Sequence, residues 1–351
     1  MRVVAALSGG VDSAVAAALL KAQGYEVIGV HLLLAECDSL CCGSAGAVNA
    51  QRVAAALGIP FYVLNLKAEF QRMVVEPFIA EYGRGRTPNP CIECNRRIKF
   101  DILRHRAAQL GAGLIATGHY ARINRDENGV FHLRKGADHS KDQSYFLYTL
   151  NQEQLAGLLL PLGEYEKQEV RQRARELGLP NAEQKESQEI CFIPDNDYAG
   201  FLRKRQPELF QPGPVYDTAG RLLGEHKGIV NFTIGQRKGL RMAFGDRRYV
   251  VKIDARQHAI YLGGEAEVYQ TRVWSENVHW VAGRPPVGTV RVWAKVRYQG
   301  AGGSALVEPL PGDRVYVKFD QPQWAPTPGQ AVVFWDGDEV LGGGTIEQSK
   351  P

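Results

Sequence analysis

Ser8-Gly9-Gly10-Val11-Asp12-Ser13 is the stretch that decides the fold of this chain. It follows the apolar run Val3–Leu7, which predicts a buried strand, and precedes Ala14–Lys21, which predicts a helix that ends near Gly24. A glycine turn between a strand and a helix presents backbone N–H groups and a positive helix dipole, and its glycines let a phosphate approach the main chain. The stretch therefore predicts a phosphate-binding loop in an α/β sheet.

The side chains of this loop predict how it uses a nucleotide. Ser8 and Ser13 add hydroxyl groups, whereas Asp12 adds a carboxylate, which suits a phosphate only when a magnesium ion lies between them. A Walker A loop would carry Lys before the Ser/Thr at the helix start, where this loop carries Val11-Asp12. The loop resembles that of the N-type ATP pyrophosphatases, which implies adenylation of a substrate oxygen and release of pyrophosphate. A glycine turn of purely structural use is the alternative.

The first half of the chain alternates strand and helix patterns. This rhythm predicts a parallel sheet covered by helices on both faces. Further strands are predicted at Glu26–Leu34, Phe61–Leu66 and Leu114–Thr117, helices at Val48–Leu57 and Lys99–Leu110, and a charged helical stretch at Gln152–Leu177.

The pattern changes after about residue 194, where helical periodicity gives way to short alternating runs separated by turn signals. An all-β second half, with one small β-domain and one β-barrel, is therefore expected. The dipeptide Asp336-Gly337 between two apolar runs predicts a hairpin. Strand-like runs are Val215-Tyr216, Tyr249–Ile253, Ile260–Leu262, Val290–Tyr298, Arg314–Phe319 and Ala331–Trp335.

Composition and charge narrow the function classes. The length of 351 residues suits two or three domains, and the apolar content of 44% argues against a disordered chain. The net charge is only +4, but residues 201–256 hold 12 Lys/Arg against 5 Asp/Glu, and residues 84–106 hold 7 against 2. Both stretches are candidates for contact with a polyanion, or are solvated surface. No signal peptide and no membrane-spanning run is visible, which predicts a cytoplasmic protein without a membrane partner.

Two cysteines, Cys91 and Cys94, lie in the proline-flanked segment Thr87–Asn95 with two residues between them. This spacing is typical of a redox pair, half of a zinc site or part of an iron–sulfur site, and two incidental thiols are the alternative. A positive charge favours the thiolate, and three basic residues follow: Arg96, Arg97 and Lys99. A third cysteine, Cys191, stands between Ile190 and Phe192, which by itself is more typical of a core position.

Three more motifs accompany the loop and the cysteine segments: Ala116–Tyr120 (ATGHY), Lys141–Phe146 (KDQSYF) and Asn231–Gly239 (NFTIGQRKG). In this order they closely resemble the tRNA-specific 2-thiouridylase family over nearly the whole chain. The resemblance implies ATP-dependent 2-thiolation of the wobble uridine in tRNA. It also implies an ATP pyrophosphatase-type catalytic domain at 1–195, a small central β-domain at 196–267 and a C-terminal β-barrel at 268–351, the last two contacting tRNA.

The same resemblance assigns roles to individual residues. Cys94 becomes the nucleophile and Cys191 the carrier of a persulfide. Residues implied to contact ATP are Ala6, Leu7, Ser8, Gly9, Gly10, Val11, Asp12, Ser13, Leu32 and Gly118. The target base would meet Asn89, Pro90 and Cys91, and tRNA contacts are implied for His119, Lys141, Asp142, Gln143, Arg297, Tyr298 and Gln330.

The expected mechanism uses two distant thiols. Adenylation turns the C2 oxygen of the uracil into a leaving group, while Asp12 holds magnesium and the loop binds the departing pyrophosphate. A persulfide on Cys191 attacks C2, and Cys94 then attacks the inner sulfur, which leaves a Cys94–Cys191 disulfide. The partners expected are tRNA, a sulfur-donor protein or sulfide source, and a reductant. The Cys191 segment is expected to fold over the site.

One position departs from the family pattern, because many members carry Asp where this chain has Cys91. An alternative hypothesis makes Cys91, Cys94 and Cys191 the ligands of an iron–sulfur cluster with one iron open for sulfur. Cys37, Cys41 and Cys42 are a weak metal-binding signal, and a structural or incidental role is favoured for them. Two rival functions also stay open: another adenylating synthetase that uses ammonia, and a non-catalytic RNA-binding protein that keeps ATP as a structural ligand.

Overall fold

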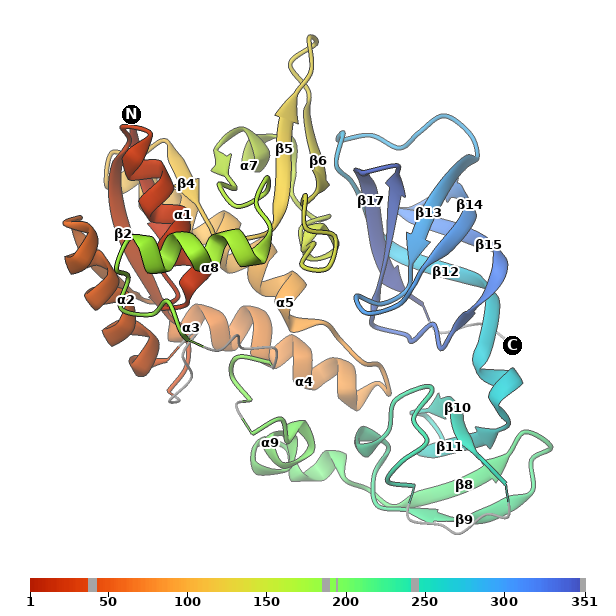
Figure 1. The fold of residues 1–351 in the computed structure, drawn as a ribbon. Helices are drawn as coiled ribbons and strands as arrows, with labels where there is room; N and C mark the ends of the chain where they lie inside the picture. The colour runs from red at the N-terminus through yellow and green to blue at the C-terminus, as the bar shows by residue number, and fades with distance from the viewer. Residues whose placement is uncertain (37–42, 185–189, 194, 241–245, 348–351) are drawn as a thin grey trace.

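The computed structural model describes residues 1–36, 43–184, 190–193, 195–240 and 246–347 of the chain. The N-terminal part is built on a five-stranded parallel sheet in the order β3-β2-β1-β4-β7 (Figure 1). Its strands are β1 (Arg2–Ala6), β2 (Glu26–Leu33), β3 (Phe61–Asn65), β4 (Leu114–Ala116) and β7 (Leu158–Leu159). The predicted α/β sheet is thus confirmed.

The central strand β1 is buried on both faces, which explains its unbroken run of apolar residues. On one face Val3 and Ala5 belong to a core cluster with side chains of α1 (Val11–Ala22) and α2 (Ser44–Leu57). On the other face Val4 joins a larger cluster that contains Phe70, Phe78 and Phe100. The strands β2 and β3 lie on one side of β1, and the chain then continues to β4 on the other side. β1 and β4 therefore form a topological switch point, where open α/β sheets bind ligands.

The helices agree less well with prediction than the strands. The stretch Gln152–Leu177 is not one helix, because Gly157 and Pro161 interrupt it and its apolar middle joins the sheet as β7. A π-helix, η2 (Cys94–Ile102), precedes α6 (Leu103–Gln109), and α9 (Tyr198–Arg205) lies where only strands were expected. In the described part of the chain the other α- and π-helices are α3 (Lys67–Phe70), η1 (Gln71–Val75), α4 (Glu76–Gly83), α5 (Pro90–Glu93), α7 (Gln152–Ala156) and α8 (Lys167–Glu176). Four short 3₁₀ turns are η3 (Ser144–Phe146), η4 (Pro207–Leu209), η5 (Ile229–Asn231) and η6 (Glu265–Val268).

Two β-structures follow, as expected. A four-stranded sheet in the order β10-β11-β8-β9 contains β8 (Gly213–Asp217), β9 (Leu222–His226), β10 (Tyr249–Asp254) and β11 (Ala259–Gly263). A six-stranded barrel is closed by pairing of its first and last strands. Its strands are β12 (Tyr269–Trp280), β13 (Val290–Lys295), β14 (Gly303–Leu310), β15 (Arg314–Trp324), β16 (Ala331–Asp336) and β17 (Glu339–Ile346).

The barrel shows the alternation that its sequence predicts. Val315, Val317 and Phe319 of β15 point into one apolar cluster, while the residues between them are more exposed. The expected hairpin after β16 is confirmed, since Asp336 pairs with Glu339 across a turn in which Gly337 has a φ of +56°.

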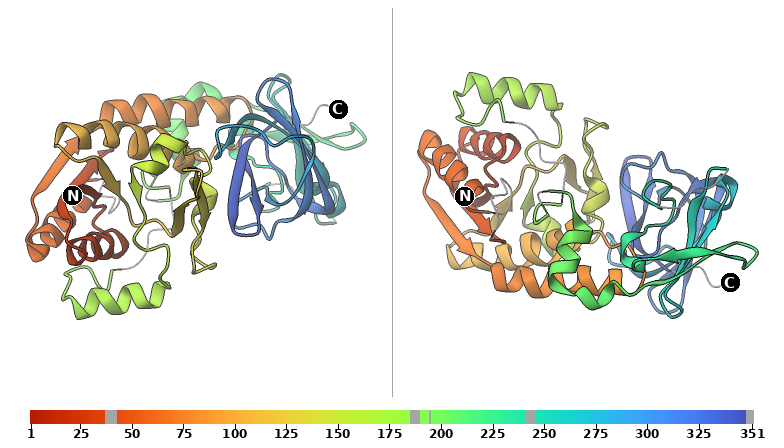
Figure 2. Two further views of the ribbon diagram at one scale, coloured as in Figure 1. Left: turned by 90° about the horizontal axis from the view of Figure 1, so that it is seen from above. Right: turned by 90° about the horizontal axis from the view of Figure 1, so that it is seen from below.

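A second hairpin, β5 (Ala121–Arg125) and β6 (Phe131–Lys135), was not predicted. It leaves the N-terminal domain and extends the barrel sheet, because β6 pairs with β17 at Arg134 and Glu339. Arg122 strengthens the junction through a hydrogen bond of 3.1 Å from its guanidinium to the Asp338 carboxylate. Figures 1 and 2 place this hairpin between the parallel sheet and the barrel, so it links the two.

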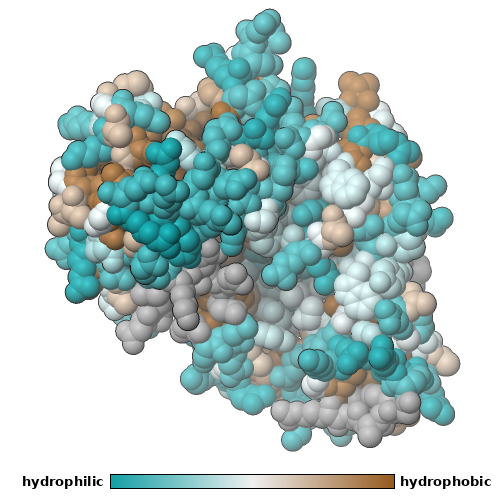
Figure 3. All heavy atoms as spheres, in the orientation of Figure 1, coloured by the Kyte–Doolittle hydropathy of each residue, from teal (hydrophilic) through white to brown (hydrophobic). Residues whose placement is uncertain are grey.

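The surface of this link is polar. Figure 3 shows mostly hydrophilic residues over the exposed tip of the β5–β6 hairpin and over α8. In the part of the chain that the structure describes, no helix is both long and apolar enough to cross a membrane.

His132 provides a pH-dependent contact in the link. Its Nδ1 lies 2.6 Å from Glu339 Oε1 and its Nε2 lies 3.3 Å from Asp126 Oδ2. The hydrogen bond with Glu339, and then that with Asp126, raises the pKa of His132. The contact therefore contributes fully below the unfolded pKa of about 6.5 and is lost as the pH rises through the higher folded pKa. We expect His132→Gln to lower the Tm more at about pH 6 than at about pH 8.5. An equal loss at both pH values would contradict this.

Candidate active site

The loop Ser8–Ser13 connects the carboxyl end of β1 to the first turn of α1. Its N-cap, Gly10, places no side chain over the helix N-terminus, so the first turn stays open to an anion. The Ser13 hydroxyl donates to the Gly10 carbonyl at 2.9 Å and accepts from the Ser8 amide at 3.2 Å. Gly9 has a φ of +87°, and a Cβ there would lie 2.7 Å from the Gly46 carbonyl oxygen of α2. The predicted loop thus has the backbone of a phosphate cradle.

Two neighbouring segments fix the walls of this cradle. Gly118 follows β4, and a Cβ on it would lie 2.8 Å from both the Asp12 carbonyl carbon and the Ser13 amide nitrogen. On the other side, Leu32 is a buried residue of β2, and His31 next to it points its Nδ1 at the Leu7 carbonyl oxygen at 2.8 Å. The residues predicted to contact ATP therefore converge at the carboxyl ends of β1, β2 and β4.

Gly118→Ala tests this close approach. The new methyl group would meet backbone atoms of α1, which cannot move aside as a flexible side chain can. We expect the variant to lose about 1–3 kcal/mol of unfolding free energy in urea titrations and to bind ATP more weakly in calorimetry. Gly113→Ala is the control, because a Cβ at Gly113, just before β4, meets nothing within 4 Å. Equal behaviour of the two variants would show that Gly118 does not need its close packing.

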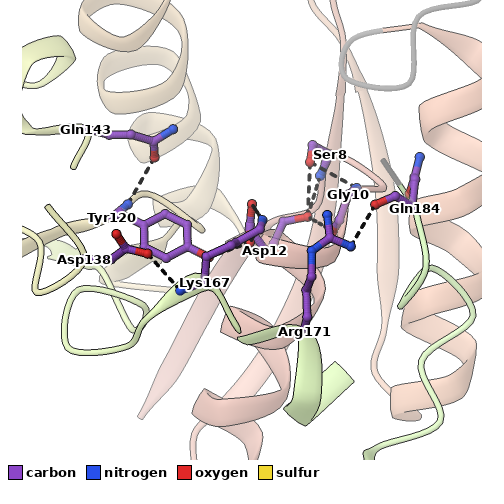
Figure 4. Close-up of polar contacts among 10 residues, drawn as sticks. Ser8, Gly10, Asp12, Tyr120, Asp138, Gln143, Lys167, Arg171 and Gln184 are labelled. Atoms are coloured by element: carbon purple, nitrogen blue, oxygen red, sulfur yellow. Dashed lines mark hydrogen bonds and ion pairs between the residues drawn. The ribbon is translucent and has the colours of Figure 1, made fainter. Parts of the chain in front are cut away.

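The side chain of Asp12 faces a cation that sequence reasoning missed. Lys167, the first residue of α8, places its Nζ 2.6 and 2.7 Å from the two carboxylate oxygens of Asp12 (Figure 4). The Tyr120 hydroxyl donates to the same carboxylate at 2.8 Å. Lys167 is buried, and its own backbone N–H donates to Asp138 at 3.0 Å, so the ammonium group is held firmly beside the loop.

Two further side chains approach the loop from the same region. Arg171 lies one turn after Lys167 on α8, and its guanidinium donates to the Gln184 carbonyl at 3.4 Å (Figure 4). Asn181 is buried, donates from its Nδ2 to the Gly9 carbonyl at 2.8 Å, and leaves its Oδ1 without a hydrogen bond. For Lys167 and Arg171 the only signal in the sequence was their i,i+4 spacing, which also fits a solvated helix face.

The cysteine motif forms its own local structure. Asn89 caps α5 by accepting a hydrogen bond of 3.1 Å from the Cys91 amide, and Pro90 occupies the first helical position. Cys91 is exposed, whereas Cys94 is buried at the start of the π-helix η2. A π-helical turn is uncommon and is frequent at functional sites. The motif thus presents one thiol to solvent and one to the protein interior.

The segment of Cys191 is anchored next to this interior by an aromatic residue. Phe192 packs edge-on against Phe70 and Phe78, with ring centroids 5.5 and 5.4 Å apart. Cys94 is a buried member of the same apolar cluster, and Cys191 packs against that cluster. A cavity of about 510 Å³ opens beside Phe192, between the end of β2, α3 and α9. Both predicted sulfur-handling cysteines thus contact the same apolar cluster, which extends from the parallel sheet to the barrel and does not by itself place the two sulfur atoms side by side.

The donor groups were tested for the two expected metals. Asp12 fits magnesium, because it offers carboxylate oxygens beside the loop and already faces a cationic group, Lys167. In the described residues no three His, Cys, Asp or Glu side chains gather so that they could hold a metal ion. Cys91, Cys94 and Cys191 therefore form no ligand set for an iron–sulfur cluster in this structure. Cys37, Cys41 and Cys42 lie outside the described residues.

Several residues predicted to contact tRNA are engaged within the protein. Burial lowers the pKa of His119 well below its usual value, and its Nδ1 lies 2.8 Å from the Thr117 hydroxyl. Asp142 accepts hydrogen bonds from the Gly136 amide at 3.0 Å and the Ser144 hydroxyl at 2.9 Å, and burial raises its pKa. Gln143 accepts from the Tyr120 amide at 3.1 Å.

The predicted tRNA contacts of the barrel lie on loops that face the N-terminal domain. Arg297 donates to the backbone carbonyls of Trp324 and Ala325 at 3.0 and 2.6 Å, and burial lowers its pKa. Tyr298 packs on Phe146, with ring centroids 4.5 Å apart. Gln330 donates to the Thr87 carbonyl at 2.8 Å. Tyr298 and Gln330 thus join the barrel to the N-terminal domain, whereas the hydrogen bonds of Arg297 stay within the barrel part of the chain.

Comparison with known families matches the three parts of the chain in order. Residues 1–195 match the family described as tRNA methyl transferase HUP domain. Residues 199–264 match the tRNA methyl transferase PRC-barrel domain, and residues 270–346 match the aminomethyltransferase beta-barrel domain. The first of these alone covers more than half of the chain, and it contains the loop and all described cysteines.

Full-length relatives define the family more narrowly. The chain is 50% identical to a tRNA-specific 2-thiouridylase MnmA of Caldanaerobacter subterraneus, over 99% of this chain and 98% of the relative. It is 48% identical to the tRNA-specific 2-thiouridylase MnmA of Geobacter metallireducens, over 99% and 96%. The structure of a 4-thiouridine synthetase–RNA complex with bound ATP is similar only at a TM-score of 0.39 and 21% identity, over 59% of this chain and 50% of that one. The chain belongs to the tRNA-specific 2-thiouridylase family.

Proposed function

We propose that this chain is a tRNA-uridine 2-sulfurtransferase, which uses ATP to replace the C2 oxygen of the wobble uridine in tRNA with sulfur. The observation that carries the proposal is the identity of 50% with a thiouridylase over nearly the full length of both chains. The placement of the cradle and two cysteines within one domain supports it. Its substrates are ATP, tRNA and a sulfur source, and its place of action is the cytoplasm, where these meet.

The first half-reaction is adenylation. The uracil C2 oxygen attacks the α-phosphorus of ATP, the bond to the β-phosphate breaks, and pyrophosphate leaves. The first turn of α1 offers N–H groups and the positive end of its dipole to that pyrophosphate. Lys167 and Arg171 add positive charge from α8, on the side of the loop where negative charge grows.

The second half-reaction is sulfur transfer. The terminal sulfur of a Cys191 persulfide attacks C2, and AMP leaves with the former C2 oxygen. The Cys94 thiolate then attacks the Cys191 sulfur, which breaks the sulfur–sulfur bond and releases 2-thiouridine. The products include a Cys94–Cys191 disulfide, and a dithiol reductant supplies the two electrons that reopen it. A sulfur-donor protein that carries a persulfide reloads the Cys191 thiolate by transfer of its outer sulfur, which leaves the donor as a thiol. A sulfide source reloads Cys191 by a different route, because sulfide attacks the Cys191 sulfur of the Cys94–Cys191 disulfide and gives a Cys191 persulfide and the Cys94 thiol without a dithiol.

Two details of this proposal concern metals. Asp12 would hold a magnesium ion, which lowers the negative charge on the departing phosphates. Lys167 must then give up part of its contact with Asp12, or hold the carboxylate from one side while the metal takes the other. An iron–sulfur cluster on Cys91, Cys94 and Cys191 would need these three side chains to gather as they do not in this structure, and a Cys91→Ser variant separates that route from the persulfide route. It keeps its activity in the persulfide route and loses it in the cluster route.

The remaining parts serve tRNA. We place the domain limits at 1–195, 196–267 and 268–351, with the central β-domain and the barrel gripping tRNA. The target base would meet Asn89, Pro90 and Cys91 after it flips out of the anticodon stack. His119, Lys141, Asp142, Gln143, Arg297, Tyr298 and Gln330 are the proposed contacts to the rest of the RNA.

One incubation tests the function against its rivals. The protein receives ATP, magnesium, a persulfide donor, a dithiol and unmodified tRNA, and nucleosides are then analysed by mass spectrometry. We expect 2-thiouridine and stoichiometric pyrophosphate. Pyrophosphate release without thiouridine would favour a synthetase that uses ammonia, and tRNA binding without pyrophosphate would favour a non-catalytic RNA-binding protein.

A further inference from the structure

The three residues before the cysteine motif form a strap, Arg86–Pro88, whose hydrogen bonds lead mainly to the other two domains. The Thr87 amide donates to the Pro328 carbonyl at 2.8 Å, and the Thr87 carbonyl accepts from Gln330 Nε2 at 2.8 Å. The Thr87 hydroxyl lies 3.4 Å from that of Thr233 in the central domain. Every polar group of Thr87 thus faces a residue at least 146 positions away.

The barrel also contacts the strap at Arg86 and packs closely against its backbone. Arg86 forms an ion pair of 2.8 Å with Glu276 of β12, and another of 2.7 Å with Glu81 of α4. Gly329 of the barrel packs so closely that a Cβ on it would lie 3.0 Å from the Thr87 amide nitrogen. The Arg86 guanidinium is thus paired with Glu81 of the N-terminal domain and with Glu276 of the barrel. These two ion pairs fix the strap between the two domains, an arrangement that we call the clamp.

The Gln330 end of the clamp is itself rigid. Its backbone carbonyl accepts from the Ile346 amide at 2.8 Å, and its amide donates to the Thr327 carbonyl at 3.0 Å. Because the backbone of Gln330 is fixed in the barrel, its side-chain amide has a defined position from which to hold the strap.

The far end of the cysteine motif is also connected to the barrel. Asn95, the neighbour of Cys94, is buried and donates from its Nδ2 to the Phe146 carbonyl at 3.2 Å. The Phe146 ring in turn packs on Tyr298 of the barrel, with centroids 4.5 Å apart. The motif from Asn89 to Cys94 therefore lies between two connections that both end in the barrel.

We propose that the barrel positions the cysteine motif, with Gln330 and the Arg86–Glu276 ion pair acting as positioning residues for Cys94. A tRNA held by the barrel would then set the geometry of the motif that receives its base, so sulfur transfer depends on a clamp remote from the reacting sulfur. Small displacements matter here, because a shift of about 1 Å at a reacting group can cost about a hundredfold in rate. This inference rests on the proposed thiolation chemistry.

Two variants loosen the clamp without removing bulk. Gln330→Glu keeps the side-chain shape but aims carboxylate oxygens at the Thr87 carbonyl, and Glu276→Gln removes the charge that holds Arg86. Asp320→Asn is the matched control, since Asp320 forms an exposed ion pair with Arg291 elsewhere on the barrel. For each variant the measurements are the single-turnover thiolation rate at saturating tRNA, the Kd for tRNA, the Tm, and the rate of Cys94 alkylation by iodoacetamide, read by peptide mass spectrometry.

We expect both clamp variants to lose about tenfold or more in single-turnover rate at saturating tRNA and to expose the buried Cys94 to faster alkylation, while the Tm of both variants, and the Kd for tRNA of Glu276→Gln, match those of Asp320→Asn. An unchanged rate at saturation with a weaker Kd would overturn the proposal, because Gln330 would then serve only as an RNA contact. A fall in rate that simply follows the Tm would also overturn it. If the wild type makes no thiouridine, the proposed function fails, and Cys94 alkylation still tests the clamp.

Discussion

A Cys94→Ser variant that carries a persulfide on Cys191 is expected to release no 2-thiouridine in a single turnover without added dithiol, while it still binds ATP and tRNA. Serine keeps the shape of the buried side chain, but its hydroxyl is not ionised near neutral pH and cannot attack a sulfur. Removing a nucleophile of this kind costs at least about a thousandfold in rate. We therefore expect the rate of product formation to fall by that factor or more.

The same variant is expected to stall at a definite step. The Cys191 persulfide can still attack C2 and displace AMP, but without Cys94 the sulfur–sulfur bond stays intact. Cys94→Ser should therefore accumulate a covalent tRNA adduct on Cys191, which added dithiol cleaves to free 2-thiouridine. Denaturing gels with labelled tRNA show the adduct. Cys191→Ser should form neither adduct nor product, and an adduct on Cys191→Ser would assign the carrier role to another residue.

Lys167→Met is expected to weaken the binding of ATP and of pyrophosphate by about 10- to 100-fold. The Lys167 ammonium lies within hydrogen-bond distance of both Asp12 oxygens, so its loss leaves a bare carboxylate beside the position of the phosphates. Hydrogen bonds to charged groups contribute about 1.5–3 kcal/mol, which corresponds to the expected factor. Calorimetric titration with ATP and with pyrophosphate measures both affinities.

Two controls separate this effect from general damage. Lys21→Met removes a lysine near the opposite end of α1, where its ammonium contacts the Leu57 carbonyl, and should leave both affinities unchanged. Tyr120→Phe removes only the uncharged hydrogen-bond donor to Asp12 and should change the two affinities by about threefold at most. Pyrophosphate binding by Lys167→Met at the wild-type affinity would show that α8 takes no part in holding phosphate.

Local patterns predicted the fold well because the sheet strands have local signatures. β1 is an apolar run bounded by a glycine turn, and the hairpin after β16 carries its own turn residues, so each could be recognised without its neighbours. The β5–β6 hairpin was overlooked although Asn128-Gly129 marks its turn. Only its pairing with β17, about two hundred residues later, leaves no mark in the hairpin itself. Gln152–Leu177 was misread because the short strand β7 needs β4 as a template.

Some residues of the candidate site could likewise be predicted from local sequence, and others could not. The loop Ser8–Ser13 was predicted from its own motif and Gly118 through the family resemblance, and the structure places the two close together. Lys167 could not be predicted, since its partner Asp12 lies 155 residues earlier and only folding brings them together. The cysteines were found through their spacing and the family resemblance. Which thiol is buried, and which loops hold the motif, depends on contacts such as that of Gln330 with Thr87 that no periodicity encodes.

The account stands on the transfer of one sulfur atom between two thiols of one polypeptide. A single turnover without added reductant, followed by digestion under acid-quenched, non-reducing conditions, measures this directly. The persulfide mechanism predicts one disulfide-linked pair of peptides, joining Cys94 to Cys191, for each 2-thiouridine formed, and no second turnover until a dithiol is added. Repeated turnovers with both thiols still reduced would contradict it.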